Sequence, residues 1–578
     1  MGKLVKYLRH YKLQAIVGPL FKMLEASFEL IVPIVMANII DIGIKTGDQG
    51  YIWKMCLVLV GLGVLGLTCS LTAQYFAAKA ALGFATELRT DLYAHINRFS
   101  YQELDTIGTS TLITRMTSDV NQVQNGVNLL LRLFSRAPFI VIGAVVMAFT
   151  ISPRLTLIFL AAIPLIGLAI FLAVRLTVPI YRKAQNILDR VVLLTRENYV
   201  GSRVVRAFSR QDEEIRQFQE TTEYLKKTQL AAGRISAMMN PATYVLVNLA
   251  IICILLAGSR QVYEGAITQG EVIALVNYMM QILLALVALA NLIVTVMRAT
   301  ASAVRVNEVF ACRTTMTDAG NEEQTGKKDS PRVVFDHVTF TYHHAKEPSL
   351  TDISFAAGRG ETVGIIGGTG SGKSTLVQLI PRFYDCGEGR VLVDGVDVKR
   401  YPFAQLRKKI GIVPQKTMLF AGTIRENLRW GKDDATQQEM DEALTTAQAK
   451  AFVCEKPEGL DTVVAAGGKN FSGGQRQRLT IARAFVGKPD ILILDDSASA
   501  LDFATDAALR AAIRRDTGDA TVFLVSQRAA TVKNADCILV LDDGRMVGKG
   551  THQELLKTCE VYREICLSQF SKEEVAGL

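Results

Sequence analysis

A glycine-rich segment in the second half of the chain has the residue types and the spacing of a phosphate-binding loop. It follows the apolar stretch 363–366, a predicted strand, and precedes a helical stretch. In such loops glycines let backbone N–H groups approach phosphates, a lysine reaches the β- and γ-phosphates, and a serine hydroxyl ligates Mg²⁺. Lys373 is therefore predicted to contact phosphates and Ser374 to bind the metal. The nucleotide-binding candidates in this segment are Gly367, Gly368, Thr369, Gly370, Ser371, Gly372, Lys373, Ser374 and Thr375.

A second nucleotide-binding element lies downstream. The apolar stretch 491–494 is followed by Asp495. A carboxylate at the end of a buried strand can hold Mg²⁺ directly or through water, as phosphoryl transfer requires. Just upstream of this strand stands a short polar sequence formed by Ser472, Gly473, Gly474 and Gln475. Together the two elements predict a Mg²⁺-dependent nucleotide site with Asp495 as a metal ligand.

The first half of the chain is far more apolar than the half that carries these motifs. Of the 578 residues, 49% are hydrophobic and 21% are charged, which fits neither a wholly soluble nor a wholly lipid-embedded chain. Spanning the hydrocarbon of a bilayer takes about 17–25 apolar residues. Stretches of this kind lie at residues 55–78, 137–153, 155–174, 235–259 and 272–297. A further candidate, the first in the chain, lies at residues 13–44 and is apolar apart from Lys22, Glu25 and Glu29. Six transmembrane helices are therefore predicted.

The distribution of charge predicts the orientation of these helices. Lys and Arg (64) exceed Asp and Glu (55) by 9, and basic residues concentrate before the first apolar stretch and between the fourth and fifth. Because cytoplasmic loops carry the excess of Lys and Arg, both termini and the long loops are predicted to be cytoplasmic, in a multi-pass protein of the plasma membrane. The basic surplus thus reflects topology, and no nucleic-acid partner is expected. The nine scattered cysteines include no CxxC pair and signal neither disulfides nor a zinc site.

These patterns divide the chain into two domains. Residues 1–310 are predicted to form an α-helical membrane domain with six helices and two long cytoplasmic loops. Residues 311–331 are polar and glycine-containing, as expected of a linker. Residues 332–578 alternate strand-like and helix-like segments, which predicts an α/β domain around the phosphate-binding loop.

The phosphate loop, the Ser-Gly-Gly-Gln signature, the Asp495 strand and the six preceding apolar stretches together resemble the ATP-binding cassette (ABC) transporter family. The resemblance covers essentially the whole chain and is to an exporter-type half-transporter, in which a membrane domain and a nucleotide-binding domain are fused. It implies ATP and Mg²⁺ as cofactors and ATPase activity. It also implies that the signature contacts ATP held by a second subunit.

The resemblance assigns roles to further residues. Tyr342, in a strand expected over 338–342, is implied to stack on adenine. Gln415 is implied to sense the metal and the γ-phosphate. The segment 499–502, which ends in Asp502, is similar to the D-loop that crosses to the partner's site. The stretches 101–119 and 201–208 are expected to hold the two coupling helices.

Two positions at the catalytic face depart from the family pattern. A glutamate usually follows the metal-binding aspartate and polarises the attacking water, but here the residue is Asp496, whose carboxylate is withdrawn by about 1.5 Å. A misplacement of about 1 Å can cost on the order of 100-fold in rate. A histidine usually contacts the γ-phosphate after the strand 521–525, but here Gln527, which carries no charge, replaces it. The two changes predict a site that binds ATP well and hydrolyses it slowly.

An impaired site beside an intact signature indicates one half of a heterodimer. The expected partner is a second, non-identical ABC half-transporter, and the expected activity is ATP-driven export of small, amphipathic or hydrophobic solutes. Three alternatives stay open. The chain could form a homodimer with two slow sites, an importer of a metal chelate built on the exporter fold, or a regulatory ATP-binding membrane subunit that does not pump.

Polar residues inside the predicted membrane helices are candidates for a substrate cavity. Polar groups at this depth face protein or a water-filled cavity rather than lipid. Those in the sixth stretch share one helical face by their spacing, and two glutamates lie one turn apart in the first. Helix–helix contacts, and pairing of the glutamates with Lys22 or a nearby arginine, are alternative interpretations. The candidate cavity residues are Glu25, Glu29, Asn277, Gln281, Asn291 and Arg298.

Overall fold

The computed structural model describes residues 2–318, 324–327, 329–343, 345–497 and 501–570. The chain forms two compact units. The first comprises Met1–Asn97 and Ser110–Cys312, and the second comprises Arg98–Thr109 and Arg313–Leu578.

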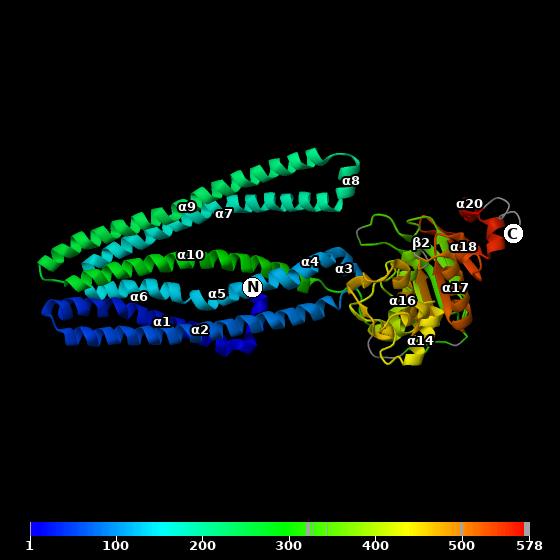
Figure 1. The fold of residues 1–578 in the computed structure, drawn as a ribbon, viewed down its shortest axis with the longest axis horizontal. Helices are drawn as coiled ribbons and strands as arrows, with labels where there is room; N and C mark the ends of the chain where they lie inside the picture. The colour runs from blue at the N-terminus through cyan, green and yellow to red at the C-terminus, as the bar shows by residue number, and fades with distance from the viewer. Residues whose placement is uncertain (1, 319–323, 328, 344, 498–500, 571–578) are drawn as a thin grey trace. The chain divides into compact units, whose positions relative to one another are not determined.

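The first unit is built of long helices (Figure 1). Six helical segments of the described residues are long and apolar enough to cross a membrane, which confirms the six predicted membrane helices. These segments are Leu4–Ile44, Gln49–Ile96, Thr109–Ile151, Pro153–Val200, Gln211–Tyr263 and Gln269–Ala311. Their elements are η1 (Gly2–Tyr11), α1 (Lys12–Asn38), η2 (Ile39–Ile44), α2 (Gln49–Ile96), α4 (Thr109–Thr114), η3 (Arg115–Asp119), α5 (Val120–Leu133), α6 (Arg136–Ile151), α7 (Pro153–Val200), α9 (Gln211–Tyr263) and α10 (Gln269–Ala311).

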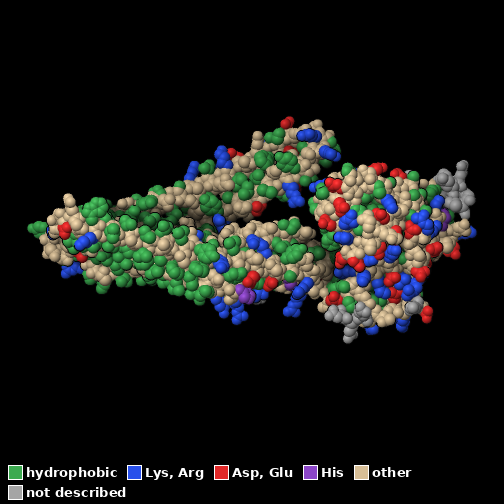
Figure 2. Space-filling view, turned by 60° about the horizontal axis from the view of Figure 1, so that its bottom comes forward, with side chains coloured by type: hydrophobic (Ala, Val, Ile, Leu, Met, Phe, Trp, Pro, Cys, Tyr) green, Lys and Arg blue, Asp and Glu red, His purple; other side chains and the backbone are tan. Residues whose placement is uncertain are grey.

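Small residues lie where these helices approach most closely. On α5, a Cβ added to Gly126 would lie 2.2 Å from the Cβ of Ala299 on α10, so this crossing requires glycine. On α2, Ala73 and Ala77 are buried, and both lie within 3.6 Å of a Cβ built on Gly18 of α1. Small residues allow such close backbone approach in membrane helices. On the face shown in Figure 2, hydrophobic side chains gather over part of the long helices, whereas charged side chains of both signs are spread over the second unit.

The pair α7 and α9 is longer than a membrane requires. With 48 residues, α7 extends about 72 Å at 1.5 Å per residue, more than twice the ~30 Å of hydrocarbon. The two helices lie side by side and are joined by the short α8 (Ser202–Ala207) (Figure 1). Around α8, Tyr199, Val200, Val204 and Phe208 are 60–82% exposed. The end of this helical pair therefore carries an apolar surface, here called the α8 patch.

The second unit contains a six-stranded sheet of order β12-β11-β3-β10-β9-β6, in which β11, β3, β10, β9 and β6 are parallel. These strands are β3 (Thr362–Gly367), β6 (Ile410–Val413), β9 (Ile491–Asp495), β10 (Thr521–Val525), β11 (Cys537–Asp542) and β12 (Arg545–Gly550). An antiparallel sheet of order β2-β1-β4-β5 comprises β1 (Val333–Phe340), β2 (Leu350–Ala357), β4 (Glu388–Val393) and β5 (Val396–Asp397). A third, small sheet pairs β7 (Gly422–Thr423) with β8 (Val463–Val464). The predicted fold class, a six-helix membrane domain fused to an α/β nucleotide-binding domain, is confirmed.

The second unit also contains ten α-helices from the described residues after β3. They are α11 (Lys373–Leu379), α12 (Phe403–Lys408), α13 (Ile424–Arg429), α14 (Gln437–Thr446), α15 (Lys450–Cys454), α16 (Gly473–Phe485), α17 (Phe503–Asp516), α18 (Ala529–Val532), α19 (His552–Thr558) and α20 (Glu560–Gln569). The strand β3 is buried at nearly every position, and β9 at all of them. Such continuous apolar strands are typical of parallel sheets covered on both faces.

A short helix from the N-terminal half belongs to the second unit. This helix, α3 (Tyr101–Ile107), follows α2 in the chain and precedes α4. Ser100 and Glu103 form a capping box at its start, and the buried Glu103 carboxylate accepts hydrogen bonds from the Thr315 N–H (3.1 Å) and hydroxyl (2.8 Å). Burial alone would raise the pKa of Glu103, but the hydrogen bonds from Ser100 and Thr315 outweigh it and lower the pKa. A charged Glu103 therefore fastens α3 to the residues after α10.

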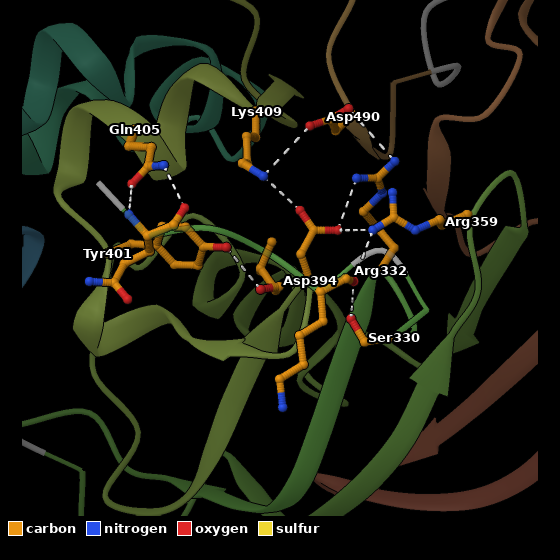
Figure 3. A network of polar contacts seen from close by, with 11 residues as sticks. Ser330, Arg332, Arg359, Asp394, Tyr401, Gln405, Lys409 and Asp490 are labelled. Atoms are coloured by element: carbon orange, nitrogen blue, oxygen red, sulfur yellow. Dashed lines mark hydrogen bonds and ion pairs between the residues drawn. The ribbon is translucent and has the colours of Figure 1, made fainter. Parts of the chain in front are cut away.

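Part of the predicted linker is fastened to the sheet through Asp394 (Figure 3). The buried Asp394 carboxylate accepts hydrogen bonds from Arg332 (2.9 Å), Arg359 (2.8 Å) and Lys409 (2.7 Å). Its backbone carbonyl accepts one from the Lys327 N–H (2.9 Å). The side chain of Gln405 hydrogen-bonds in both directions with the backbone of Gln324, at 3.0 and 2.9 Å. Residues 319–323 and 328 of the predicted linker lie outside the described residues.

Candidate functional site

The glycine-rich loop leaves β3 and leads into α11. Gly370 and Gly372 have φ angles of +85° and +91°, which only glycine adopts readily. A Cβ on Gly367 would lie 2.1 Å from the carbonyl oxygen of Leu541, and one on Gly372 would lie 2.7 Å from that of Ser349. The glycines are thus required both by the shape of the loop and by its close packing.

Lys373 is held against this loop. Its Nζ donates hydrogen bonds to the carbonyl oxygens of Gly367 (3.0 Å) and Gly368 and to the Ser371 hydroxyl (3.3 Å). Burial lowers the pKa of Lys373, and the charges of Asp495 and Asp496 act in the opposite direction. The ammonium group can exchange these neutral acceptors for phosphate oxygens, which form stronger, charge-assisted bonds.

Ser374 and Asp495 form an oxygen-rich corner of the site. The Ser374 hydroxyl donates to the Asp495 carboxylate at 3.0 Å, and Asp495 is 5% exposed. Burial raises the pKa of Asp495, the charge of Asp496 adds to this, and Ser374 and Lys373 oppose it. Mg²⁺ prefers oxygen ligands and is usually held by one or two protein groups together with substrate phosphates. These two side chains therefore fit a nucleotide-bound Mg²⁺.

One cavity of about 300 Å³ brings most of the predicted site together. Its lining residues are Tyr342, Ser349, Thr369, Gly370, Gly372, Lys373, Ser374, Thr375, Gln415, Asp495, Asp496, Val525, Ser526 and Gln527. Residues that lie far apart in sequence meet here because β3, β9 and β10 are neighbours whose carboxyl ends share one edge of the sheet. Ser349, Val525 and Ser526 were missed at the sequence level, where no motif marks them.

Tyr342 differs from its sequence-based placement. The expectation that it lies in a strand was wrong, because β1 ends at Phe340. Beyond the strand, the Tyr342 side chain turns inward, where its hydroxyl lies 3.1 Å from that of Thr375. Burial raises the pKa of Tyr342. The ring is thus fixed beside the phosphate loop.

Asp496 and Gln527 follow two adjacent parallel strands, β9 and β10. Asp496 has φ +46° and donates its backbone N–H to the Val525 carbonyl at 3.0 Å. The Gln527 carbonyl accepts from the side-chain amide of Gln569 at 2.8 Å, and the Gln569 side-chain oxygen accepts from the Ala529 N–H at 2.8 Å. Gln569, the last residue of α20, therefore bridges Gln527 in the loop after β10 and Ala529, the first residue of α18. This role was missed because the residue is 42 positions away in sequence.

The Ser-Gly-Gly-Gln signature lies at the start of α16 and does not line the cavity. Ser472 and Gln475 form a capping box, and Ser472 is exposed. Gly473 and Gly474 form the first turn of the helix. Of the D-loop segment, Ser499 and Ala500 lie outside the described residues. Asp502 caps α17 by accepting the Thr505 N–H at 2.7 Å, which lowers the pKa of Asp502.

The membrane candidates come together only in part. Glu25 pairs with Lys22 at 2.5 Å, and Glu29 pairs with Arg136 at 2.7 Å. These two glutamates and Arg136 line a cavity of about 490 Å³ with Ser70 and apolar residues of α1 and α2. The Gln281 side chain donates to the Glu29 carbonyl at 3.4 Å.

None of the four candidates of the sixth membrane helix, α10, lines this cavity. Asn277 donates to the Ile273 carbonyl of its own helix at 3.0 Å. Asn291 and Arg298 are exposed on the same helix.

Comparisons with known proteins agree with this architecture. The family descriptions "ABC transporter transmembrane region" and "ABC transporter" match residues 15–286 and 350–499. The uncharacterized ABC transporter ATP-binding protein YfiB of Bacillus subtilis is 37% identical over 99% of both chains. The probable multidrug resistance ABC transporter ATP-binding/permease protein YheI of the same organism is 33% identical over 98% of this chain and 96% of its own.

A solved structure shows the same fold. A bacterial Atm1-family ABC exporter with ATP bound superimposes with a TM-score of 0.80, at 24% identity, over 98% of this chain and 99% of that chain. With relatives that match along the whole length and a cavity built from the family's phosphate loop, the chain belongs to the ABC transporter family, as a half-transporter that fuses the membrane region to the ATPase domain.

Proposed function

We propose that this chain is the hydrolysis-impaired subunit of a heterodimeric ABC exporter. The observation that carries the proposal is the position of Asp496 and Gln527, which both line the nucleotide cavity at the edge where β9 and β10 end. Family members usually have a glutamate and a histidine there. Asp496 and Gln527 leave the binding groups Lys373, Ser374 and Asp495 in place, so the site retains tight ATP·Mg²⁺ binding with slow turnover.

A second half-transporter is proposed to complete both ATP sites. Because Ser472 lies outside the cavity of its own subunit, this signature is available to ATP held by another chain. The α8 patch supports the same assembly, since exposed apolar groups of this kind mark protein–protein contacts. The partner is proposed to be non-identical and to supply the intact catalytic groups, while this chain supplies the intact signature.

The transported solute is proposed to be small and amphipathic or hydrophobic. The membrane cavity is lined mainly by apolar side chains, and its two glutamates are each neutralised by a cation. Such a lining does not select strongly for net charge, and the relative YheI is named as a probable multidrug resistance transporter. Export would run across the plasma membrane, with both termini in the cytoplasm.

Restoration of the family residues tests the impaired site. The chain is co-purified with its partner, whose own phosphate-loop lysine is replaced, and single-turnover hydrolysis is measured with Asp496→Glu and Gln527→His combined. Each restored group should raise the rate by about 10²–10⁴-fold. Asp496→Asn is the matched control and should produce no rise. An unchanged rate in the double variant would place the defect elsewhere, for instance in the opposing signature, and would contradict the proposed role of these two residues.

Transport with defined sidedness tests the direction. ATP added to inside-out membrane vesicles should drive accumulation of an amphipathic dye, and replacement of the partner's phosphate-loop lysine should abolish it. Accumulation in right-side-out vesicles loaded with ATP would instead favour the importer alternative. Neither ATPase activity nor dye movement in the assembled pair would favour a regulatory subunit.

A further inference from the structure

The short helix α3 is attached to the second unit by a tyrosine as well as by Glu103. The Tyr384 hydroxyl donates a 2.6 Å hydrogen bond to the Asp105 carboxylate of α3. The ring of Tyr101, at the start of α3, lies 4.6 Å from that of Phe383 and 6.0 Å from that of Tyr384. Residues of α3 thus contact two successive aromatic side chains of the nucleotide-binding unit.

The same Tyr384 contacts the residue proposed to meet the nucleotide base. Its ring centroid lies 5.3 Å from that of Tyr342, with the two planes at 85°. Phe340 fills the space beside both rings, at 4.8 Å from Tyr342 and 5.5 Å from Tyr384. Tyr342 in turn lines the nucleotide cavity. A continuous set of contacts therefore runs from Asp105 through Tyr384 to Tyr342.

Because these contacts are buried and closely packed, the position of the Tyr342 ring affects that of Tyr384. Tyr384 is 8% exposed, and burial together with the hydrogen bond to Asp105 raises its pKa, so the hydroxyl remains a donor at neutral pH. Edge-to-face aromatic pairs have defined geometry, and packed interiors shift between discrete arrangements rather than deforming freely. If a bound base holds the Tyr342 ring in place, the orientation of the Tyr384 ring packed against it is restricted as well.

The connectivity of the chain links α3 to the membrane helices. The helix α3 is the segment between α2 and α4, and each of these belongs to a membrane-spanning helical segment. The backbone therefore joins α3 at both ends to membrane segments.

We propose that Tyr384 is a positioning residue that makes the attachment of α3 depend on the base of the bound nucleotide. This inference rests on the proposed contact between Tyr342 and adenine. It separates two signals in one ligand: the phosphates are held by the loop around Lys373, whereas the base acts on α3 through Tyr342 and Tyr384.

Hydrogen exchange of the full-length chain in lipid nanodiscs tests this separation. ATP·Mg²⁺ and Mg²⁺-tripolyphosphate, which has the phosphates but no base, are compared at saturating concentrations. Both should protect the amides of residues 367–375, but only ATP should slow exchange in residues 101–107, by at least the roughly five-fold that marks measurable coupling between sites. Equal protection of residues 101–107 by tripolyphosphate would overturn the inference.

Substitutions then identify the residue that carries the effect. Tyr384→Phe removes only the hydroxyl and should abolish the ATP-dependent protection of α3 while leaving that of residues 367–375 intact. The matched control is Tyr401→Phe, which removes a hydroxyl from another buried tyrosine of the same unit, one that donates to the Val393 carbonyl at 3.1 Å. The control should retain the response of α3.

Asp105 provides a conservative rescue. Asp105→Asn keeps an acceptor oxygen and should retain the response, whereas Asp105→Leu should lose it.

Retention of the full response of α3 in Tyr384→Phe would contradict the role of Tyr384 even though ATP binds. If ATP failed to protect residues 367–375 of the unsubstituted chain, the proposed function and this inference would both be wrong.

Discussion

The Ser374 hydroxyl donates a 3.0 Å hydrogen bond to the Asp495 carboxylate and so joins the start of α11 to the end of β9, across 121 positions of sequence. Both side chains line the nucleotide cavity. Their oxygen atoms are where a nucleotide-bound Mg²⁺ would find protein ligands. This relationship makes the metal dependence of ATP binding a direct test of the site.

Asp495→Asn should weaken ATP binding only when Mg²⁺ is present. The amide cannot supply the negative charge that favours the ion, so affinity should fall by at least the roughly 10-fold that follows loss of even an outer-shell metal partner. Titration with a fluorescent ATP analogue, with Mg²⁺ and then with EDTA, measures the difference. Asp336→Asn, at the exposed pair with Arg390, is the control and should behave as the unsubstituted chain. An equal loss of affinity in EDTA would argue against metal binding by Asp495.

The bridge made by Gln569 should matter for turnover more than for binding. Gln569→Ala removes the hydrogen bond to the Gln527 carbonyl and the one from the Ala529 N–H at the start of α18. In the chain with Asp496→Glu and Gln527→His, loosening this loop should lower single-turnover hydrolysis by up to about 100-fold, since misplacement by about 1 Å has that effect. ATP affinity should change little, because Lys373 and Ser374 are not touched. Gln569→Glu keeps the acceptor for the Ala529 N–H, so its hydrolysis rate should lie between that of the chain with Gln569 and that of the Gln569→Ala variant. A parallel loss of affinity would indicate general destabilisation instead.

The attachment of α3 by Glu103 should depend on pH. The folded pKa of Glu103 lies below its usual value of 4.5 because hydrogen bonds from Ser100 and Thr315 favour the charged form despite burial. Its contribution is therefore fully present above about pH 4.5 and is lost as the pH falls through the lower, folded pKa. Proteolysis of the segment around α3 should accelerate as the pH falls below 4.5 in the unsubstituted chain. Glu103→Gln should be cleaved faster at pH 7 and should lack this pH-dependent step.

The sequence predicted the parts of this protein that depend on local chemistry. Apolar stretches of this length cross a bilayer as helices, because a helix satisfies all of its backbone hydrogen bonds within itself, so the six helices could be predicted. The phosphate loop could be predicted because its glycines meet a local steric requirement. Contacts that depend on tertiary packing could not be predicted from the sequence. Nothing local places Gln569 beside Gln527, Tyr384 between Asp105 and Tyr342, or Asp394 among three cations. The polar stripe of the sixth helix shows the same limit, since equal spacing did not bring Asn291 and Arg298 to the cavity of Glu25 and Glu29.

Asp394 offers the clearest test of a contact that only the fold creates. Asp394 is 2% exposed, and its carboxylate accepts hydrogen bonds from Arg332, Arg359 and Lys409 (Figure 3). Arg332 is also buried. Removal of one partner from a buried charged group leaves the others uncompensated and costs about 3–5 kcal/mol. Asp394→Asn should therefore lower the thermal unfolding temperature of the second unit and expose residues 324–332 to protease. Asp336→Asn again serves as the control, because an exposed pair contributes about 0–1 kcal/mol. Equal effects of the two substitutions would show that the network around Asp394 does not hold the linker to the sheet.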